Sequence, residues 1–385
     1  MHVYRREEKH GIAIPRGQAA RGTGARLTTR IARLATYFGL LLLLASTPAR
    51  SAQPGEGQEL LVFGSAEANR TDPDQLPASN DALASADILY SLTRNRFRLL
   101  GELIVSTEEF ELERFQVGWL PHETTWLFAG RYHQPTNYWA SVYHHGQYLQ
   151  TSITRPNIDA WEDDFGVLQT HQTGIMVESN FGLRENTGLE IAVSYGSGSA
   201  IGDGVLEPFD VLDGESLAGA SFAARIGFLP DILGNNAIGI LLGKSEFESS
   251  DSQVIIPDLA DVKQEFMGAF VNWTAGSWHG IGAAYHVRNK LDRASLSTSD
   301  SFTAGYVQLE KSIADWTLYG RLENTAGAEE SDYLTLFPEY VIQRSLIGVR
   351  LDFMKRHAVT LELFDAENSV GDFKQIAIQW SAAFR

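Results

Sequence analysis

The chain has 385 residues, no cysteine and a formal net charge of −17. The lack of cysteine excludes disulfide bonds and thiolate metal sites. The acidic balance argues against nucleic acid as a partner, because nucleic-acid binders need basic patches. After residue 45 no apolar run reaches the length of about 18 to 20 residues that a membrane-spanning helix needs.

The N-terminal segment has the features of a secretory signal peptide. Arg26, Arg30 and Arg33 precede the apolar run ATYFGLLLLLAS, and small residues follow it. A basic flank, an apolar core and a small-residue exit are typical of an exported protein. We therefore predict a leader and signal peptide over 1–51, cleaved after Ser51, and one domain over 52–385. A short membrane anchor is the alternative. Without residues 1–51 the chain keeps 22 basic and 46 acidic residues.

Alternation of apolar and polar residues runs through the rest of the chain. In the last run, Ile376, Ile378 and Trp380 share one face, and Gln375 and Gln379 share the other. A period of two predicts β-strands. The predicted strands lie at 59–67, 86–93, 96–106, 110–119, 124–132, 172–181, 188–196, 217–228, 236–247, 263–274, 278–288, 300–311, 315–323, 341–353, 357–364 and 373–384.

The connections between these strands alternate between short and long. Short turns lie on one side of the predicted sheet. Seven of the eight connections on the other side are long, and these are 68–85, 133–171, 197–216, 248–262, 289–299, 324–340 and 365–372. This sorting predicts an all-β fold, a closed antiparallel transmembrane β-barrel of about 16 strands (14–18) in a bacterial outer membrane. A soluble secreted β-protein is the alternative.

Aromatic residues gather near the short-turn ends of the predicted strands. A tryptophan at a membrane interface can bury its ring and keep its N–H in water. We therefore predict an interfacial girdle of Trp119, Trp126, Trp273, Trp278, Trp316, Trp380 and Phe384.

Charged residues recur on the polar face of several strands, in the middle of the strand. In a barrel this face lines the lumen, where mixed charges orient polar solutes. The alternative is that these charges pair along the wall and affect transport little. The lumen-wall candidates are Arg98, Glu102, Arg114, Arg321, Glu323, Arg350 and Asp352.

The stretch from Arg131 to Pro156 is rich in His, Tyr, Trp and Gln and carries little charge. It opens the longest connection, 133–171, and we predict that this segment folds into the lumen and narrows it. The pore or constriction candidates are Arg131, His133, Tyr143, His144, His145 and Arg155.

We also considered a metal site at His133, His144, His145 and His171. Their spacing matches no standard signature, and adjacent His144 and His145 cannot both point one way in an extended chain. We therefore predict ring stacking and hydrogen bonding for these residues, and neither a metal nor a cofactor. The neighbouring acidic run Glu162-Asp163-Asp164 is predicted to be solvated.

Catalytic motifs are missing from the sequence. It contains no GxSxG, HExxH, P-loop or CxxC pattern, so we predict no catalytic residues and no enzyme. The glycine-rich run GSGSAIGDG (196–204) is followed by no helix pattern. We interpret it as a flexible outer loop and not as a phosphate-binding loop.

The run GRYHQPTNYWASVYHHGQYLQTSITRP resembles a block shared by a group of porin-like proteobacterial outer-membrane β-barrel proteins that have no assigned substrate. The likeness is sharp over about residues 86–175. It implies a barrel, and more broadly a porin whose third loop enters the lumen. Two departures are that Arg385 follows the terminal Phe384 and that no lysine ladder is present.

These observations predict a porin-like channel for passive diffusion of small polar solutes, narrowed by the 133–171 loop. The expected partners are outer-membrane lipid, lipopolysaccharide, small polar solutes and further copies of the chain in a homo-oligomer. The first alternative is a non-conducting structural or surface-binding barrel. The second is an outer-membrane barrel hydrolase.

Overall fold

The computed structural model describes residues 57–74, 77–107, 110–143, 146–162, 164–209, 219–250, 253–294 and 296–384. The predicted leader and signal peptide over 1–51 lies outside these residues. None of the helices in the described ranges is long and apolar enough to cross a membrane.

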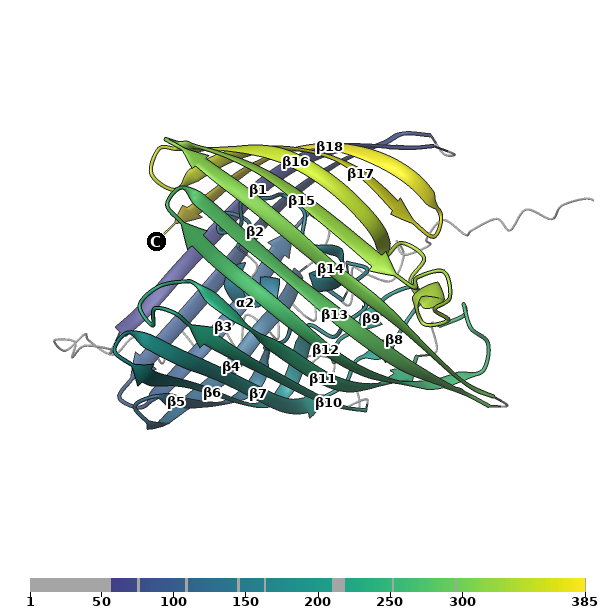
Figure 1. The fold of residues 1–385 in the computed structure, drawn as a ribbon, viewed down its shortest axis with the longest axis horizontal. Coiled ribbons are helices and arrows are strands. Elements are labelled where there is room, and N and C mark those ends of the chain that lie inside the picture. Colours follow the sequence, from purple (N-terminus) through teal and green to yellow (C-terminus); the bar gives the residue numbers. More distant parts are fainter. Residues whose placement is uncertain are drawn as a thin grey trace, which may run out of the picture. The chain divides into compact units, whose positions relative to one another are not determined.

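Long antiparallel strands form a single closed sheet (Figure 1). Each long strand pairs with its neighbours in chain order, β7 pairs with β10, and β1 pairs with both β2 and β18. In the described part of the chain, these long strands are sixteen in number, as the alternation predicts. They are β1 (Gly57–Pro73), β2 (Ser79–Arg94), β3 (Phe97–Ser106), β4 (Phe110–His122), β5 (Thr125–His133), β6 (His171–Arg184), β7 (Thr187–Ser197), β10 (Ala220–Leu229), β11 (Ala237–Ser249), β12 (Leu259–Ala275), β13 (Trp278–Arg293), β14 (Ser297–Ile313), β15 (Trp316–Ala326), β16 (Val341–Phe353), β17 (His357–Asn368) and β18 (Gly371–Phe384).

Short elements occupy the three longest connections. The connection from β5 to β6 holds the helix α2 (Tyr138–Tyr143) and the 3-10 turn η1 (Asn157–Asp159). The connection from β7 to β10 holds the two short strands β8 (Ala200–Ile201) and β9 (Leu206–Glu207). The connection from β15 to β16 holds the 3-10 turn η2 (Leu334–Leu336).

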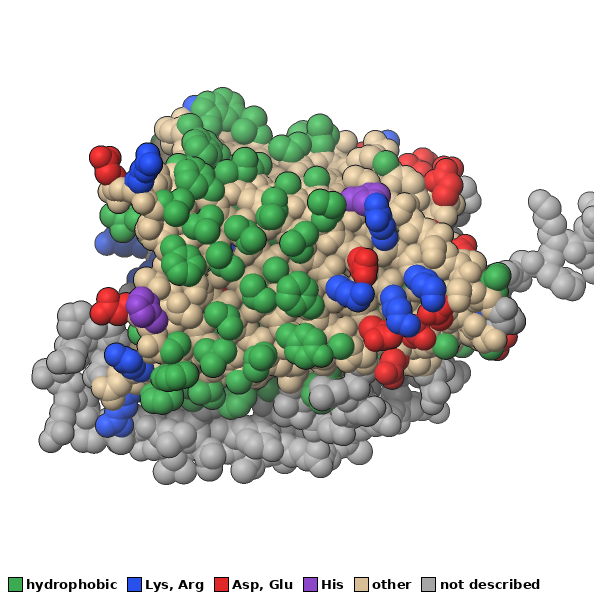
Figure 2. Space-filling view, turned by 60° about the horizontal axis from the view of Figure 1, so that its bottom comes forward, with side chains coloured by type: hydrophobic (Ala, Val, Ile, Leu, Met, Phe, Trp, Pro, Cys, Tyr) green, Lys and Arg blue, Asp and Glu red, His purple; other side chains and the backbone are tan. Residues whose placement is uncertain are grey.

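The barrel exposes apolar side chains outward and buries charged ones inside. Leu318 and Ile347 are 48% and 65% exposed, whereas Arg321, Glu323 and Glu362 are at most 3% exposed. Figure 2 shows hydrophobic side chains over the left and middle of one face, with most charged side chains toward the right-hand end. A soluble sandwich has the opposite arrangement, so this surface is one that faces lipid.

The aromatic girdle is present, with one exception. Trp119, Trp273, Trp278 and Trp316 are each more than 40% exposed at the short-turn ends of their strands, and Trp380 and Phe384 are exposed in the same way. Trp126 was assigned to the girdle wrongly. Its ring stacks with Phe128 on the inner face, and the guanidinium carbon of Arg98 lies 4.7 Å from its centroid.

Several connections that the sequence predicts to be long are short, because the strands extend past the apolar belt. β1 and β2 meet at residues 74–78 instead of 68–85, and β13 and β14 meet at 294–296. In these extensions some outward positions carry charged residues, and Lys290 and Asp292 of β13 form a surface ion pair there. The alternation therefore continues, but the outward face is suited to water. The long connections are 134–170, 198–219 and 327–340.

A hydrophobic core fills part of the barrel interior, so the inner face of the wall is not polar throughout. The inner face of β11 to β14 carries buried Phe247, Phe266 and Phe270. Trp139 of α2 and Tyr333 of the 327–340 connection are fully buried against the same cluster. Apolar residues therefore occupy both faces of these four strands, one facing lipid and the other facing the inner segments.

The outward apolar face predicts the effect of a charge at mid-strand. Ile347→Lys places an ammonium near the middle of β16, where burial in hydrocarbon costs about 2–4 kcal/mol. We expect the free energy of unfolding in liposomes, from urea titration, to fall by about that amount. Val254→Lys, at an exposed loop residue between β11 and β12, is the matched control and should change it by less than about 0.5 kcal/mol. Equal effects of the two substitutions would contradict the assignment of this face to lipid.

Candidate functional site

The connection between β5 and β6, residues 134–170, lies against the inner surface of the barrel and is called the inner loop here. Its helix α2 starts where the Asn137 side chain accepts a hydrogen bond from the Ala140 N–H (2.8 Å), which is an N-cap. From α2, Tyr138 stacks on Phe270 of β12, with ring centroids 3.9 Å apart. The helix therefore packs on the apolar part of the wall.

Arg321 of β15 holds the inner loop by its backbone. Its guanidinium donates hydrogen bonds to the carbonyls of Thr154 (3.0 Å) and Arg155 (3.1 Å) and to the hydroxyl of Ser152 (3.0 Å). Its Nε donates to Glu323 at 2.7 Å. Since Arg321 is 1% exposed, the loop replaces the water that this charge would otherwise need.

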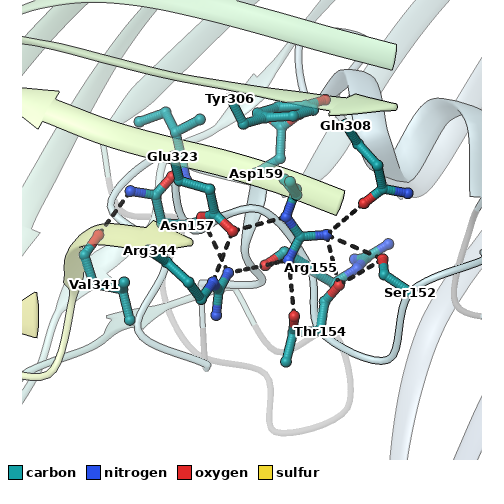
Figure 3. Close-up of polar contacts among 12 residues, drawn as sticks. Ser152, Thr154, Arg155, Asn157, Asp159, Tyr306, Gln308, Glu323, Val341 and Arg344 are labelled. Atoms are coloured by element: carbon teal, nitrogen blue, oxygen red, sulfur yellow. Dashed lines mark hydrogen bonds and ion pairs between the residues drawn. The ribbon is translucent and has the colours of Figure 1, made fainter. Parts of the chain in front are cut away.

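Arg344 of β16 and Glu323 extend this anchor (Figure 3). Arg344 pairs with Glu323, with its Nε 2.7 Å from Oε1, and also donates to the Arg155 carbonyl. Glu323 in turn accepts the backbone N–H of Asn157 at 2.6 Å. The side chain of Asn157 donates to the Val341 carbonyl (2.7 Å). Two arginines and one glutamate of the wall thus fix the loop at 154–157.

A second set of wall residues fixes the loop at 148–154. Glu362 of β17 accepts the backbone N–H groups of Ile153 (3.0 Å) and Thr154 (3.1 Å). Arg350 of β16 donates to the carbonyls of Tyr148 (2.9 Å) and Gln150 (2.6 Å). Backbone N–H groups of the loop therefore donate to a wall glutamate, and backbone carbonyls of the loop accept from a wall arginine.

Asp159 anchors the loop to β13 and β14. Its carboxyl group accepts hydrogen bonds from the hydroxyls of Tyr285 (2.7 Å) and Tyr306 (2.9 Å) and from the Trp139 N–H (3.1 Å). Complete burial raises the pKa of Asp159 to about 6, and these donors oppose the shift only in part. Burial also lowers the pKa of the Arg155 guanidinium to about 9.

Aromatic and charged side chains cluster where the inner loop joins the wall. The guanidinium carbon of Arg155 lies 3.7 Å from the Trp161 ring centroid. Trp161 lies beside His133 (5.0 Å) and His171 (5.2 Å), measured between ring centroids. Ring stacking is therefore present as the sequence predicts. Arg131 lies next to this cluster and donates to the Glu113 carbonyl (3.0 Å) and the Phe209 carbonyl (2.7 Å).

Glycine residues next to this cluster allow the backbones of neighbouring strands to approach closely. Gly130 has a φ of 132°, and a Cβ atom there would lie 2.1 Å from the Phe115 carbonyl oxygen. Gly130 faces Gly174 on β6, which faces Gly196 on β7. The Tyr132 hydroxyl donates to the Ile175 carbonyl at 2.7 Å. Residues without side chains are needed here because neighbouring backbones approach so closely.

The remaining candidate residues lie in separate places. Glu102 and Arg114 form a buried ion pair on β3 and β4. Arg350 pairs with Asp352, which is 44% exposed, at 2.8 Å. Tyr143 ends α2 and packs on Trp139, with ring centroids 4.8 Å apart. His144 and His145 lie outside the described residues.

Two expectations about the loops are wrong. Glu162 is fully buried, because its Oε2 accepts the backbone N–H groups of Thr170 and His171 (2.8 Å), whereas Asp164 is exposed. Asp163 lies outside the described residues. The glycine-rich run 196–204 ends β7 and opens a connection on the expected outer side, but it is not a free loop, since Ile201 within it is fully buried in the interior cluster.

Sequence reasoning missed several residues that hold the loop. Arg344 and Glu362 occupy inward positions of the alternation and could have been found by extending it along β16 and β17. Asp159 gives no such signal, because it lies in a loop without a period. Tyr285 and Tyr306 resemble ordinary core aromatics in the sequence.

A polar cavity of about 570 Å³ lies between α2 and the wall of β7 and β10 to β14. An ion pair and a histidine–carboxylate contact line it: Arg225 Nε lies 3.2 Å from Glu190 Oε1, and His279 Nδ1 lies 3.2 Å from Glu310 Oε2. Leu149 of the inner loop also lines it and is 42% exposed. The cavity borders the turn at 230–236, so it lies on the short-turn side of the inner loop.

Solved structures with the same architecture are outer-membrane porins and channels. The anion-selective porin from Comamonas acidovorans is similar with a TM-score of 0.60 and 9% identity, over 86% of this chain and 100% of that chain. OmpF of Salmonella typhi, solved with daunomycin, gives 0.56 and 11% over 87% and 100%. The channel DcaP of Acinetobacter baumannii gives 0.54 and 11% over 88% and 100%.

The chain has the fold of an outer-membrane porin. At these identities the likeness concerns the fold alone. No protein-family model matches the sequence, and no curated protein matches it. The outward apolar surface and the porin fold agree in placing the barrel in a bacterial outer membrane.

The raised pKa of Asp159 predicts a dependence of stability on pH. Its contribution is fully present below the ordinary value of 3.8 and is lost as pH rises through about 6. The free energy of unfolding of the wild type, relative to Asp159→Asn, should therefore increase by roughly 1–3 kcal/mol between pH 7 and pH 4. Urea titration in liposomes at several pH values measures it. A difference that is flat, or that grows as pH rises, would contradict the assignment.

Proposed function

We propose that this protein is a channel of the bacterial outer membrane for passive diffusion of small polar solutes, and that the inner loop sets its width. The observation that carries this proposal is the anchoring of the inner loop. Arg321, Arg344 and Arg350 donate to four of its backbone carbonyls, and Glu323 and Glu362 accept from its backbone N–H groups. A segment fixed on so many buried charges is a permanent part of the lumen.

The cavity supports a preference for small polar solutes. The cavity holds the ion pair Glu190–Arg225 and the contact between Glu310 and His279. The Glu190–Arg225 pair makes a local transverse field that orients a dipole. The anion selectivity in the name of the Comamonas porin is not carried over to this chain.

Three further expectations complete this proposal. The first is membership in the group of porin-like proteins that share the RYHxPxxYWxxxYHHG block. In this structure that block includes the end of β5 and the helix α2. Lipid and lipopolysaccharide are the expected partners of the apolar outer surface. Assembly into a homo-oligomer fits the trimer form of the neighbour OmpT from Vibrio cholerae, which has a TM-score of 0.53.

A non-conducting structural or binding barrel is the second candidate, and one observation favours it. The interior cluster joins α2, the 198–209 segment and the 327–340 connection to the inner face of β11 to β14. This packing removes much of the lumen. On the opposite wall, the inward residues Glu67, Asn69 and Thr71 of β1 are only partly buried.

Deletion of residues 137–152 tests the constriction. Removing α2 and the Arg350-bound segment should raise the single-channel conductance several-fold in planar bilayers, because the occluding part of the loop is gone. Heat-modifiable mobility must first show that the variant is folded. Unchanged conductance would exclude the inner loop as the constriction. If neither the wild type nor the folded deletion variant conducts, the non-conducting barrel is favoured.

Loss of the arginine anchor should loosen the loop without removing it. The double substitution Arg321→Ala and Arg344→Ala deletes the donors to the Thr154 and Arg155 carbonyls and leaves Glu323 without its ion pairs. We expect noisier currents and a mean conductance at least twofold higher, since the loop loses its fixed position. Arg288→Ala, on the exposed face of β13, is the control and should match the wild type. A double variant with wild-type currents would argue against this anchor.

A further inference from the structure

Three neighbouring strands bring nitrogen and carboxylate donors together at the base of the inner loop. His133 of β5 and His171 of β6 are directly opposed in the strand register. Glu113 of β4 joins them, and one ligand atom from each residue lies within 4.8 Å of the others. All three side chains are at least nine-tenths buried. Because the residues belong to paired strands, the sheet itself fixes this arrangement.

Glu162 of the inner loop lies on the other side of the His171 ring. Its Oε2 lies 3.6 Å from His171 Nδ1 and is oriented by the backbone N–H groups of Thr170 and His171. Glu113 lies on the Nε2 side of the same ring, at 2.7 Å. Because the two ring nitrogens point in different directions, an ion bound at Nε2 beside Glu113 is not also bound by Glu162. Glu162 therefore orients the His171 ring and is not a ligand.

We propose that Glu113, His133 and His171 form a binding site for a divalent transition-metal ion of the zinc class. Two imidazoles and one carboxylate are a donor set that zinc accepts, with bonds of about 2.0–2.2 Å and a fourth tetrahedral position for water. Calcium and magnesium prefer six or more oxygen ligands and are a poor match. Glu113 and the neighbouring Glu162 together offset the double charge of the ion.

Metal binding competes with an ion pair inside the same cluster. His171 Nε2 lies 2.7 Å from Glu113 Oε2, so without a metal a protonated His171 lies between two carboxylates. A metal ion takes the place of that proton and requires neutral imidazoles. The neighbouring Arg155 guanidinium is held over Trp161, at 3.7 Å from the centroid, and does not belong to the donor set. Affinity should therefore fall as pH falls.

The site would fix the base of the inner loop. Glu113, His133 and His171 belong to the sheet, and Glu162 of the loop faces the Nδ1 side of His171, so a bound ion orients the ring that the loop contacts. This inference does not depend on conduction, because a non-conducting barrel would have the same site.

Metal content tests the site directly. The full barrel, refolded in detergent and checked by heat-modifiable mobility, is loaded with Zn²⁺ alone, dialysed and measured by mass spectrometry. We expect about one Zn²⁺ per chain, and a loss of at least tenfold in affinity for His133→Ala and for Glu113→Gln. His286→Ala, which removes a partly exposed histidine of β13 away from the cluster, should retain the wild-type affinity.

The visible absorption spectrum of the wild type with Co²⁺ tests the site even if the variants fail to fold. Co²⁺ in the same site should give the intense visible bands of tetrahedral coordination, and Zn²⁺ should remove them. Absence of uptake by the folded wild type, or equal uptake by folded His133→Ala, would overturn the proposal. In that case His171 remains the cation of a metal-free ion pair.

Discussion

A buried guanidinium must have all its N–H groups hydrogen-bonded, and this requirement at Arg321 governs the interior of the barrel. Leaving such a charge without partners inside a protein costs several kcal/mol. Glu323 satisfies Nε, and backbone carbonyls and hydroxyls of the inner loop satisfy most of the rest. The dependence is mutual, since the carbonyls of an irregular loop also need donors when they are buried. The wall and the loop are therefore stable only together.

The strands of the barrel and their lipid-facing side follow from the sequence with little ambiguity. Alternation places the sixteen long strands at the predicted positions, because lipid on one side and polar contacts on the other impose a period of two. The strand ends were harder to predict. Beyond the apolar belt some outward residues are charged, as at Lys290 and Asp292 of β13, and an apolar-run criterion ends the strand too early. Trp126 is a second error of the sequence prediction. Its residue type indicated the membrane interface, but its place in the alternation of β5 puts the ring on the inner face.

The interior was less predictable, for physical reasons. Wall charges such as Arg321 and Glu323 appear in the alternation, but many of their partners are backbone groups of Thr154, Arg155 and Asn157, and a backbone group has no sequence signature. In the sequence, β11 to β14 carry apolar residues on both faces, as strands buried on both sides do. This pattern is compatible with lipid outside and a packed core inside. Glu162 was interpreted from its acidic neighbours, although the two backbone N–H groups that bury it lie eight and nine residues away.

The closed sheet also constrains the order of events during assembly. The binding position of the inner loop includes Arg350 on β16 and Glu362 on β17, which come about 200 residues later in the chain. The pairing of β1 with β18 then seals the sheet. A loop that entered after this step would have to carry its polar backbone through the mouth of a finished barrel. The loop and the last strands must therefore come together while the sheet is still open. Closure is slow because its contacts are so distant in sequence. During that interval the edge of β1 is unpaired, which makes it the natural place for a folding catalyst to hold the chain.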